Sequence, residues 1–548
     1  MKKLTLCFML ILALLIHTLP AVADSTSGAP DLSEYFSKRD LSGTWDTFEA
    51  VQVDLNALSG VYSIDKAGVY VLSGTLNGSV QVSAGESDKV QLVLNNADIT
   101  SETGAAIVIE SADKVFVTLA EGSVNKLTGK AFTESESVDA ALFSRQDMTI
   151  NGSGSLTVVS ANHGIVGKDD LKVTGGIISI TAEGRGLDGN DSVRICDGSF
   201  TIVSAKDAIR SKESEKEGKG YVLIAGGTFD LAVGGGAQNA KPHRDEMGRG
   251  GFGPSRGSSV SGSSSSDSTK GVKAAQQIVI MGGTLNVDSA DDALHTDGDL
   301  IIYNGELNLQ SGDDGIHADN ALTINGGTVN VLESYEGLEA TVLTINGGNI
   351  SVTASDDGLN VAGGNDSSGF GWNDMFASDG VSLIAINGGS LYVNSAGDGI
   401  DSNGDLTMTG GTVVVSGPTN SMNGALDYNG TGTISGGTLI AAGAVGMAEN
   451  FSSASSQAST MVNLSGQPGE ITVKDAEGNI LLSATVEKSF SCVVISSPDL
   501  TFGNRYTVSS GASTMEFTAG SGSTGGGFGS PGWQQPGGQG GPGGRRGW

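Results

Sequence analysis

The chain has 548 residues, a formal net charge of -31, 85 glycines and only 5% aromatic residues. Such an acidic surface repels nucleic acid and anionic membranes. It favours binding of cations, or of anionic partners that bind through bridging cations. Three cysteines are too few for a disulfide framework, while much glycine with few aromatics favours short strands joined by tight turns.

The first residues carry an export signal. Two lysines precede an apolar run at 4–15, and a small-x-small cleavage signal ends at Ala23. This predicts a signal peptide over residues 1–23, and a secreted, extracellular protein without a membrane anchor. The apolar run is too short to span a bilayer comfortably. We expect residues 24–50 to be a linker.

A unit of about 22 residues repeats through residues 51–450, as in 322–331 (LTINGGTVNV) and 343–352 (LTINGGNISV). Apolar and polar residues alternate on both sides of the glycine pair, which indicates half-buried strands around a tight corner. A second, Asp-Gly corner recurs at the same step. Stacked copies would share one core, which predicts an all-β, right-handed parallel β-helix solenoid with two strands and three corners per coil. Leucine-rich repeats have this length, but their Asn/Cys-centred leucine pattern is absent.

The repeat ends before the C-terminus. Residues 451–518 keep short strands around turns but lack the repeat, so we expect a C-terminal β cap or small β domain. Residues 519–548 are rich in glycine and proline and are expected to be disordered.

Two insertions interrupt the repeat, at about 235–268 and 363–380. Insertions in solenoids concentrate on the functional face. The second insertion carries Phe370 and Trp372, and exposed aromatic rings offer a sugar an apolar platform. We therefore predict that both contact carbohydrate, although Trp372 could instead cap a small satellite core.

Stacking places residues one repeat apart in columns with a spacing of about 4.8 Å. Through the Asp-Gly corner one column reads His163, Arg185, Asp207, Lys270, Asp292, Asp314, Glu336, Asp357 and Asp398. Such a run of carboxylates needs protons or a cation, and hard carboxylate oxygens select calcium. We predict Ca²⁺ as the cofactor, with these ligands: Asp291, Asp292, Asp297, Asp313, Asp314, Asp319, Glu336, Asp356 and Asp357. The alternative is that Asp-Gly is only good turn chemistry.

Basic and imidazole side chains stand beside the acidic coils. We predict that calcium bridges an acidic polysaccharide and that four cations contact it directly: Arg210, Lys212, Lys270 and Lys273. An equally weighted alternative is that these four cations only neutralise neighbouring carboxylates and do not contact the sugar. His295 and His317 resemble a metal pair, but stacked imidazoles serve equally well as hydrogen-bonding neighbours of other ligands, so the sequence does not assign zinc to them.

Seven segments match the motifs of one family: 70–75, 90–96, 163–171, 292–295, 313–319, 360–365 and 489–498. In them the chain resembles bacterial secreted carbohydrate-binding β-helix proteins that share their fold with pectate lyases. The resemblance covers about residues 44–510. It implies calcium binding and affinity for polygalacturonate or a cellulose-like polysaccharide, without established catalysis.

We therefore expect non-catalytic, calcium-dependent binding of an extracellular, acidic, pectin-like polysaccharide. The enzymatic alternative is a pectate-lyase-like polysaccharide lyase acting by β-elimination, with Lys270 or Lys273 as the base. No single base stands out among the neighbouring cations, so no catalytic residue is assigned. A third alternative is a structural or adhesive surface solenoid that calcium only stiffens.

Overall fold

The chain is all-β. The computed structural model describes residues 28–132, 137–241, 268–361 and 380–523. These residues contain strands and three short 3-10 helices, with no α-helix among them: η1 (Leu32–Glu34), η2 (Leu55–Ala57) and η3 (Ala237–Asn239). No helix in these ranges is long and apolar enough to cross a membrane.

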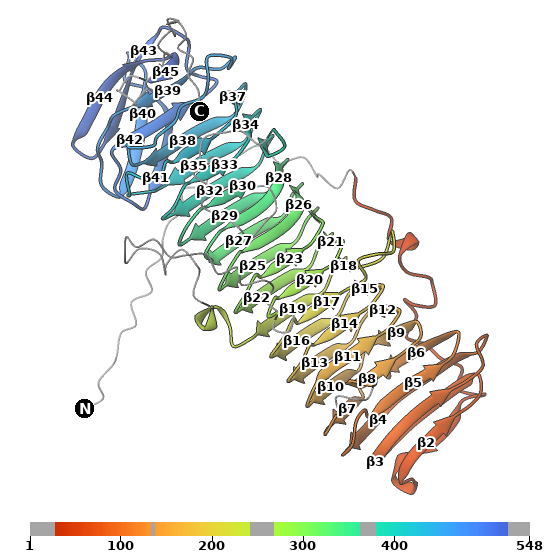
Figure 1. Cartoon of the computed structure of the whole chain (residues 1–548). Helices are drawn as coiled ribbons and strands as arrows, with labels where there is room; N and C mark the ends of the chain where they lie inside the picture. Colours follow the sequence, from red (N-terminus) through yellow and green to blue (C-terminus); the bar gives the residue numbers. More distant parts are fainter. Residues whose placement is uncertain (1–27, 133–136, 242–267, 362–379, 524–548) are drawn as a thin grey trace, which may run out of the picture.

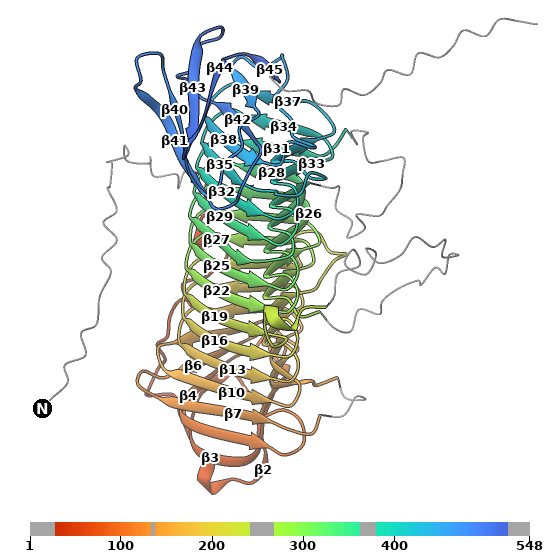
Figure 2. The same cartoon turned by 90° about the vertical axis from the view of Figure 1, so that its left-hand side faces the viewer.

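Most strands line three faces of one elongated stack (Figures 1 and 2). The long-strand face consists of β7 (Val124–Gly129), β10 (Ser155–Ser160), β13 (Ile177–Ala182), β16 (Ser199–Ser204), β19 (Thr228–Val233), β22 (Thr284–Ser289), β25 (Glu306–Ser311), β27 (Thr328–Glu333), β29 (Asn349–Ala354), β32 (Ser390–Ser395), β35 (Thr412–Ser416) and β38 (Thr438–Gly443). The short-strand face consists of β5 (Ile107–Ser111), β8 (Ala140–Ser144), β11 (His163–Gly167), β14 (Leu187–Gly189), β17 (Ile209–Ser211), β20 (Val272–Ala274), β23 (Leu294–Thr296), β26 (Ile316–Ile324), β28 (Leu338–Ile345), β30 (Leu359–Val361), β33 (Ile400–Ser402) and β36 (Leu426–Tyr428).

The strap face is named after the N-terminal segment that lies on it. It consists of β6 (Lys114–Leu119), β9 (Met148–Gly152), β12 (Asp170–Val173), β15 (Ser192–Ile195), β18 (Tyr221–Ile224), β21 (Gln277–Ile280), β24 (Asp299–Ile302), the second halves of β26 and β28, β31 (Leu383–Ile386), β34 (Asp405–Met408) and β37 (Gly432–Ile434). The first coils are built from β1 (Val51–Asp54), β2 (Gly60–Ile64), β3 (Gly68–Ser83) and β4 (Lys89–Ser101).

Pairing along the stack is parallel, within a sheet of 41 strands. In the regular part each strand pairs with its counterpart one repeat away, for example β10 with β13, β11 with β14 and β12 with β15. A repeat therefore contributes three strands, whereas the sequence predicted two. The additional one is the three-residue strand directly after the Asp-Gly corner, such as β23, which is too short to show a period.

The corners and the core explain the repeat. Gly327, the second of a glycine pair, has φ +85°, a conformation that side-chain-bearing residues rarely adopt. In the following strand, alternate residues point inward, as in β27, where Val329 and Val331 are buried. Like side chains then stack from coil to coil. Phe200 and Phe229 have ring centroids 4.7 Å apart and planes 2° from parallel.

The described part of the expected linker packs along the strap face, where Figure 1 shows it beside β15, β12 and β9. Phe36 is buried with Leu223 and Val279. Asp40 is fully buried, with its carboxylate 2.5 Å from Lys114 Nζ. Burial favours the neutral acid, but hydrogen bonds from Lys114 and from hydroxyl groups outweigh it and hold the pKa of Asp40 well below its usual range.

The last strands differ from the stack. β42 (Cys492–Ser496) pairs antiparallel with β38 and β39 (Ser459–Val462), and β39 also pairs with β45 (Ser521–Ser523). A separate antiparallel sheet in the order β41-β40-β43-β44 shares a second apolar core with β38, β39 and β42. Its strands are β40 (Gly469–Lys474), β41 (Ile480–Val486), β43 (Arg505–Ser510) and β44 (Ser513–Thr518). It lies within residues 451–518, where the sequence predicts a β cap.

Several predictions fall wholly or largely outside the described residues. They are the signal peptide at 1–23, most of the insertions at 235–268 and 363–380 with Phe370 and Trp372, and most of the tail at 519–548.

Candidate functional site

The predicted corner column and a second column beside it follow the short-strand face. Strand register aligns Lys273, His295, His317, Glu339, Asn360, Asp401 and Asp427, which we call the strand column. The corner column lies three residues earlier in each coil: Lys270, Asp292, Asp314, Glu336, Asp357 and Asp398. Both columns pass from cations to carboxylates along the stack.

Corner aspartates bind the backbone of the next coil. Asp292 Oδ1 accepts a hydrogen bond from the Asp314 N–H at 3.1 Å, and Asp357 Oδ1 accepts one from the Asp398 N–H at 2.6 Å. Asp398 Oδ1 accepts one from the Gly424 N–H. A corner aspartate thus satisfies a backbone donor between coils, and its second oxygen is left to meet another partner.

Lys270 neutralises the first acidic coil. Its Nζ lies 3.0 Å from Asp291 Oδ1 and 2.6 Å from Asp292 Oδ2, and its side chain is only 11% exposed. Burial disfavours the ammonium, but the two carboxylates outweigh it and raise the pKa of Lys270. The structure therefore argues against both predicted roles of Lys270. Its ammonium is engaged within the protein, and a lysine held protonated is a poor base for elimination.

His295, on β23, lies between the carboxylates of two aspartates. Its Nδ1 lies 2.7 Å from Asp292 Oδ2 and its Nε2 lies 3.0 Å from Asp297 Oδ1. Asp297 also lies 3.6 Å from Lys273 Nζ. Two predicted metal ligands, Asp292 and Asp297, are therefore matched by two lysines and an imidazole.

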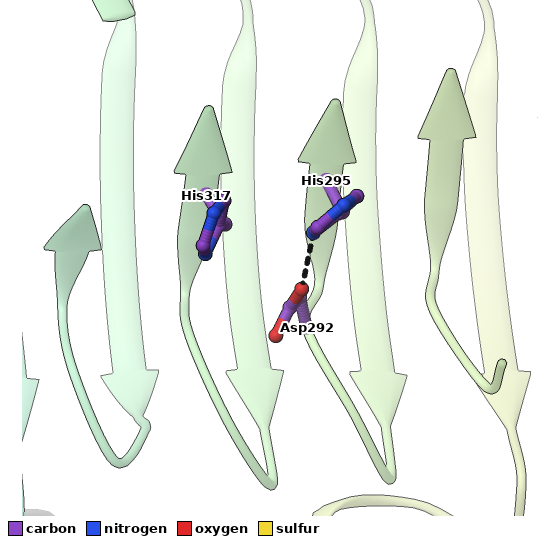
Figure 3. Close-up of side chains that lie close together, drawn as sticks. All are labelled: Asp292, His295 and His317. Atoms are coloured by element: carbon purple, nitrogen blue, oxygen red, sulfur yellow. Dashed lines mark hydrogen bonds and ion pairs between the residues drawn. The ribbon is translucent and has the colours of Figure 1, made fainter. Parts of the chain in front are cut away.

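His317, one coil further, repeats this arrangement with an extra acid. Nδ1 lies 2.8 Å from Asp314 Oδ2 and 2.9 Å from Glu339 Oε2, and Nε2 lies 3.0 Å from Asp319 Oδ1. Burial would lower the pKa of His317, but the hydrogen bonds to the three carboxylates raise it well above its usual range. Figure 3 shows the two imidazoles on neighbouring strands, with ring centroids 4.8 Å apart.

From Glu336 onward the carboxylates of the two columns, apart from Glu339, have no cationic partner in the described part of the chain. We call Glu336, Asp357, Asp398 and Asp401 the acidic cluster. All four are partly exposed, and oxygens of the three aspartates lie within 4.8 Å of one another. Burial and neighbouring carboxylates raise the pKa of Glu336 to about 8 and that of Asp398 to about 7, and they raise those of Asp357 and Asp401. Within the described ranges no Lys, Arg or His nitrogen forms an ion pair with them.

Asn360 adds an oxygen beside this cluster. Its Nδ2 donates to Glu336 Oε2 at 2.6 Å, while its Oδ1 is buried and has no hydrogen-bond partner among the described residues. Carboxylate and amide oxygens without a nitrogen ligand are the donor set that calcium prefers. The residues here therefore fit the predicted cation.

Three of these residues, Asn360, Asp398 and Asp401, were absent from the predicted ligand set. The prediction followed doubled acids, as in Asp313-Asp314, and Asp356-Asp357 is the last such pair on this face. Aligning the repeats by register would have identified these three residues, because neither column contains a basic residue or a histidine after His317. Asp427 and Glu449 extend the acidic run, and burial raises the pKa of Glu449 to about 7.

The model of a family described as carbohydrate-binding domain-containing protein matches residues 59–315 and 314–497. The chain belongs to this family. A carbohydrate-binding domain-containing protein from Acetivibrio thermocellus is 41% identical over 194 residues, which make up 34% of this chain and 68% of that protein. A solved structure of a polysaccharide lyase-like protein from C. thermocellum, a gadolinium derivative, is 28% identical. The match covers 50% of this chain and 96% of the chain in the solved structure, with a TM-score of 0.37.

Carbohydrate binding is thus supported as the general function of this family member, and its remaining cations can be judged as sugar contacts. Arg210 is held by Asp188 through two hydrogen bonds of 3.0 and 3.2 Å. Lys212 is exposed, and no carboxylate in the described part of the chain forms an ion pair with it. Lys212, and Lys273 with its loose contact to Asp297, are the least engaged of the four predicted cations.

Proposed function

We propose that this chain is a secreted right-handed parallel β-helix that binds an acidic, pectin-like polysaccharide through calcium at the acidic cluster. The observation that carries the proposal is a set of partly exposed carboxylates that form no ion pair with a cation among the described residues: Glu336, Asp357, Asp398 and Asp401. The same face also presents Lys212 and the loosely paired Lys273. Family membership supports the carbohydrate, and the oxygen-only donor set supports the calcium.

The charges of the two partners explain why a cation is needed. A uronic-acid chain and the acidic cluster repel each other, so direct contact is unfavourable. Calcium would be held by the four carboxylates with Asn360 Oδ1, and when bound it supplies positive charge and open positions for sugar oxygens. Lys212 and Lys273 would add direct contacts to sugar carboxylates at the neighbouring coils.

The corner aspartates position the cluster. Asp357 and Asp398 each bind a backbone N–H of the following coil, so their carboxylates are fixed relative to the stack. A site that is rigid before the ion arrives loses little conformational entropy on binding. The two ion pairs of Lys270 argue against this lysine as the base of a lyase, which leaves Lys273 as the alternative base for the assay below to test.

Retention of the full chain on immobilised polygalacturonate tests the proposal. We expect retention with calcium and release by a chelator, strong loss in Asp398→Asn/Asp401→Asn, and no loss in the matched surface variant Asp46→Asn. Soluble polygalacturonate should show no rise in the ultraviolet absorbance of unsaturated products. Retention that survives chelation contradicts the calcium mechanism, and rising absorbance would establish a lyase.

A further inference from the structure

Two successive coils carry the same motif, Asp-x-x-His-x-Asp, in different charge surroundings. In the first copy, Asp292-His295-Asp297, Lys270 and Lys273 contact the two aspartates. In the second copy, Asp314-His317-Asp319, Glu339 approaches the imidazole as a third carboxylate. No lysine or arginine of the described ranges forms an ion pair with these three acids.

The imidazole of His317 is oriented as a metal ligand is. Its Nε2 hydrogen-bonds Asp319, and a ligating histidine commonly gives its second ring nitrogen to a carboxylate in this way. Its Nδ1 then faces Asp314 Oδ2 and Glu339 Oε2 at 2.8 and 2.9 Å. One nitrogen position can present one proton to two carboxylates, whereas a divalent ion in the same place would be bound by all three atoms.

We propose that Asp314, His317 and Glu339 form a buried site for a divalent transition-metal ion such as Zn²⁺, separate from the acidic cluster. This inference does not rest on the proposed function. All three side chains are buried, with residue exposures of 5%, 2% and 7%, and their ligand atoms lie within 4.8 Å of one another.

The chemistry of the ligands separates this site from a calcium site. An imidazole nitrogen suits zinc and its first-row neighbours, whereas calcium takes oxygen ligands at longer distances. Zinc bonds of about 2.0–2.1 Å in tetrahedral geometry would set ligand atoms about 3.3 Å apart. Asp314 and Glu339 therefore need to withdraw from Nδ1 by only about 0.5 Å, which rotation of two carboxylates can supply.

The neighbouring copy explains why one site, and not two, is expected. Nδ1 of His295 faces a single carboxylate, Asp292, and that carboxylate is already bound by Lys270 at 2.6 Å. An ion there would have to displace a buried ammonium. His295 and His317 thus form a natural pair of control and test residues on adjacent strands (Figure 3).

Calorimetric titration of Zn²⁺ into the full, tag-free chain tests the site, with calcium kept in large excess so that oxygen-only sites are filled. We expect one zinc site, weakened at least tenfold in His317→Gln and in Glu339→Gln and changed less than twofold in His295→Gln. Zinc binding that calcium abolishes, or an equal loss in His295→Gln, would overturn the assignment.

A second measurement covers the case in which the His317 variant does not fold. X-ray absorption of the unmodified chain loaded with one equivalent of zinc should show nitrogen and oxygen ligands with the scattering of one imidazole. A spectrum with oxygen ligands alone would place the ion elsewhere and refute the proposal.

Discussion

Replacing Lys270 by methionine tests whether this residue is a structural counter-charge or a sugar contact. The substitution keeps most of the apolar stem and removes an ammonium that lies 2.6 Å from the buried Asp292 carboxylate. Removing one partner of a buried ion pair costs about 3–5 kcal/mol because the remaining charge is left uncompensated. Asp292 keeps its bonds to His295 and to the Asp314 N–H, so we expect the lower value, about 3 kcal/mol.

Native-state hydrogen exchange is the suitable assay, because long repeat arrays do not unfold in a single two-state step. A loss of about 3 kcal/mol corresponds to a fall of about a hundredfold in the protection of amides in β20, β23 and the start of β26. Lys273→Met is the control, since its contact of 3.6 Å is to an aspartate that is 45% exposed. Such a surface pair is worth about 0–1 kcal/mol.

Two results would separate the roles of Lys270. The structural role is supported if Lys270→Met loses amide protection but each folded molecule keeps its affinity for polygalacturonate. Protection within threefold of the unmodified chain, together with weaker binding of polygalacturonate, would refute it and restore Lys270 as a sugar contact.

Three further predictions follow from other parts of the stack. Without divalent cations, stability should fall as pH rises from about 5 to about 8, because the folded state favours the protonated forms of Glu336 and Asp398, with pKa values of about 8 and about 7; melting temperatures that rise over this window would contradict the reasoning. Asp40→Asn should destabilise the chain by about 3 kcal/mol, since Lys114 loses its buried partner; exchange in β9 and β12 checks this against Asp46→Asn. Gly315→Ala should cost about 1–3 kcal/mol, because a Cβ would lie 2.6 Å from the Gly337 carbonyl oxygen. Chemical denaturation should separate it from Gly520→Ala, which has open space, and equal midpoints would refute the clash.

The period of the sequence predicted the columns correctly because each repeat must bury the same alternate residues. The register aligns Lys273, His295, His317 and Glu339 three residues after the corner column that the 22-residue step predicted. The glycines were harder to interpret. Gly327 has the positive φ expected of a tight corner, but Gly315 has none, and it is required because the next coil's backbone leaves no room for a side chain. A close contact between coils cannot be predicted from the local sequence of a turn.

The proposed calcium site lies in the same columns as the predicted ligands but further along the stack. The pairs of adjacent aspartates led to a predicted calcium site in the coils of Asp292 and Asp314. In these coils Lys270 and two histidines already form ion pairs with the carboxylates. Compensation depends on how far a lysine reaches across coils, which spacing along the chain does not give. The segment with Phe36 and Asp40 was expected to be a linker because it lacks the repeat, although it packs along the strap face.

The most direct test of the account is a calcium titration of the full chain beside Asp398→Asn/Asp401→Asn. We predict that the unmodified chain binds calcium with an affinity that falls at least tenfold in the double variant, and that Asp291→Asn, beside the lysine-paired coil, leaves it unchanged. Equal calcium isotherms for the double variant and the unmodified chain would show that the acidic cluster does not hold the ion.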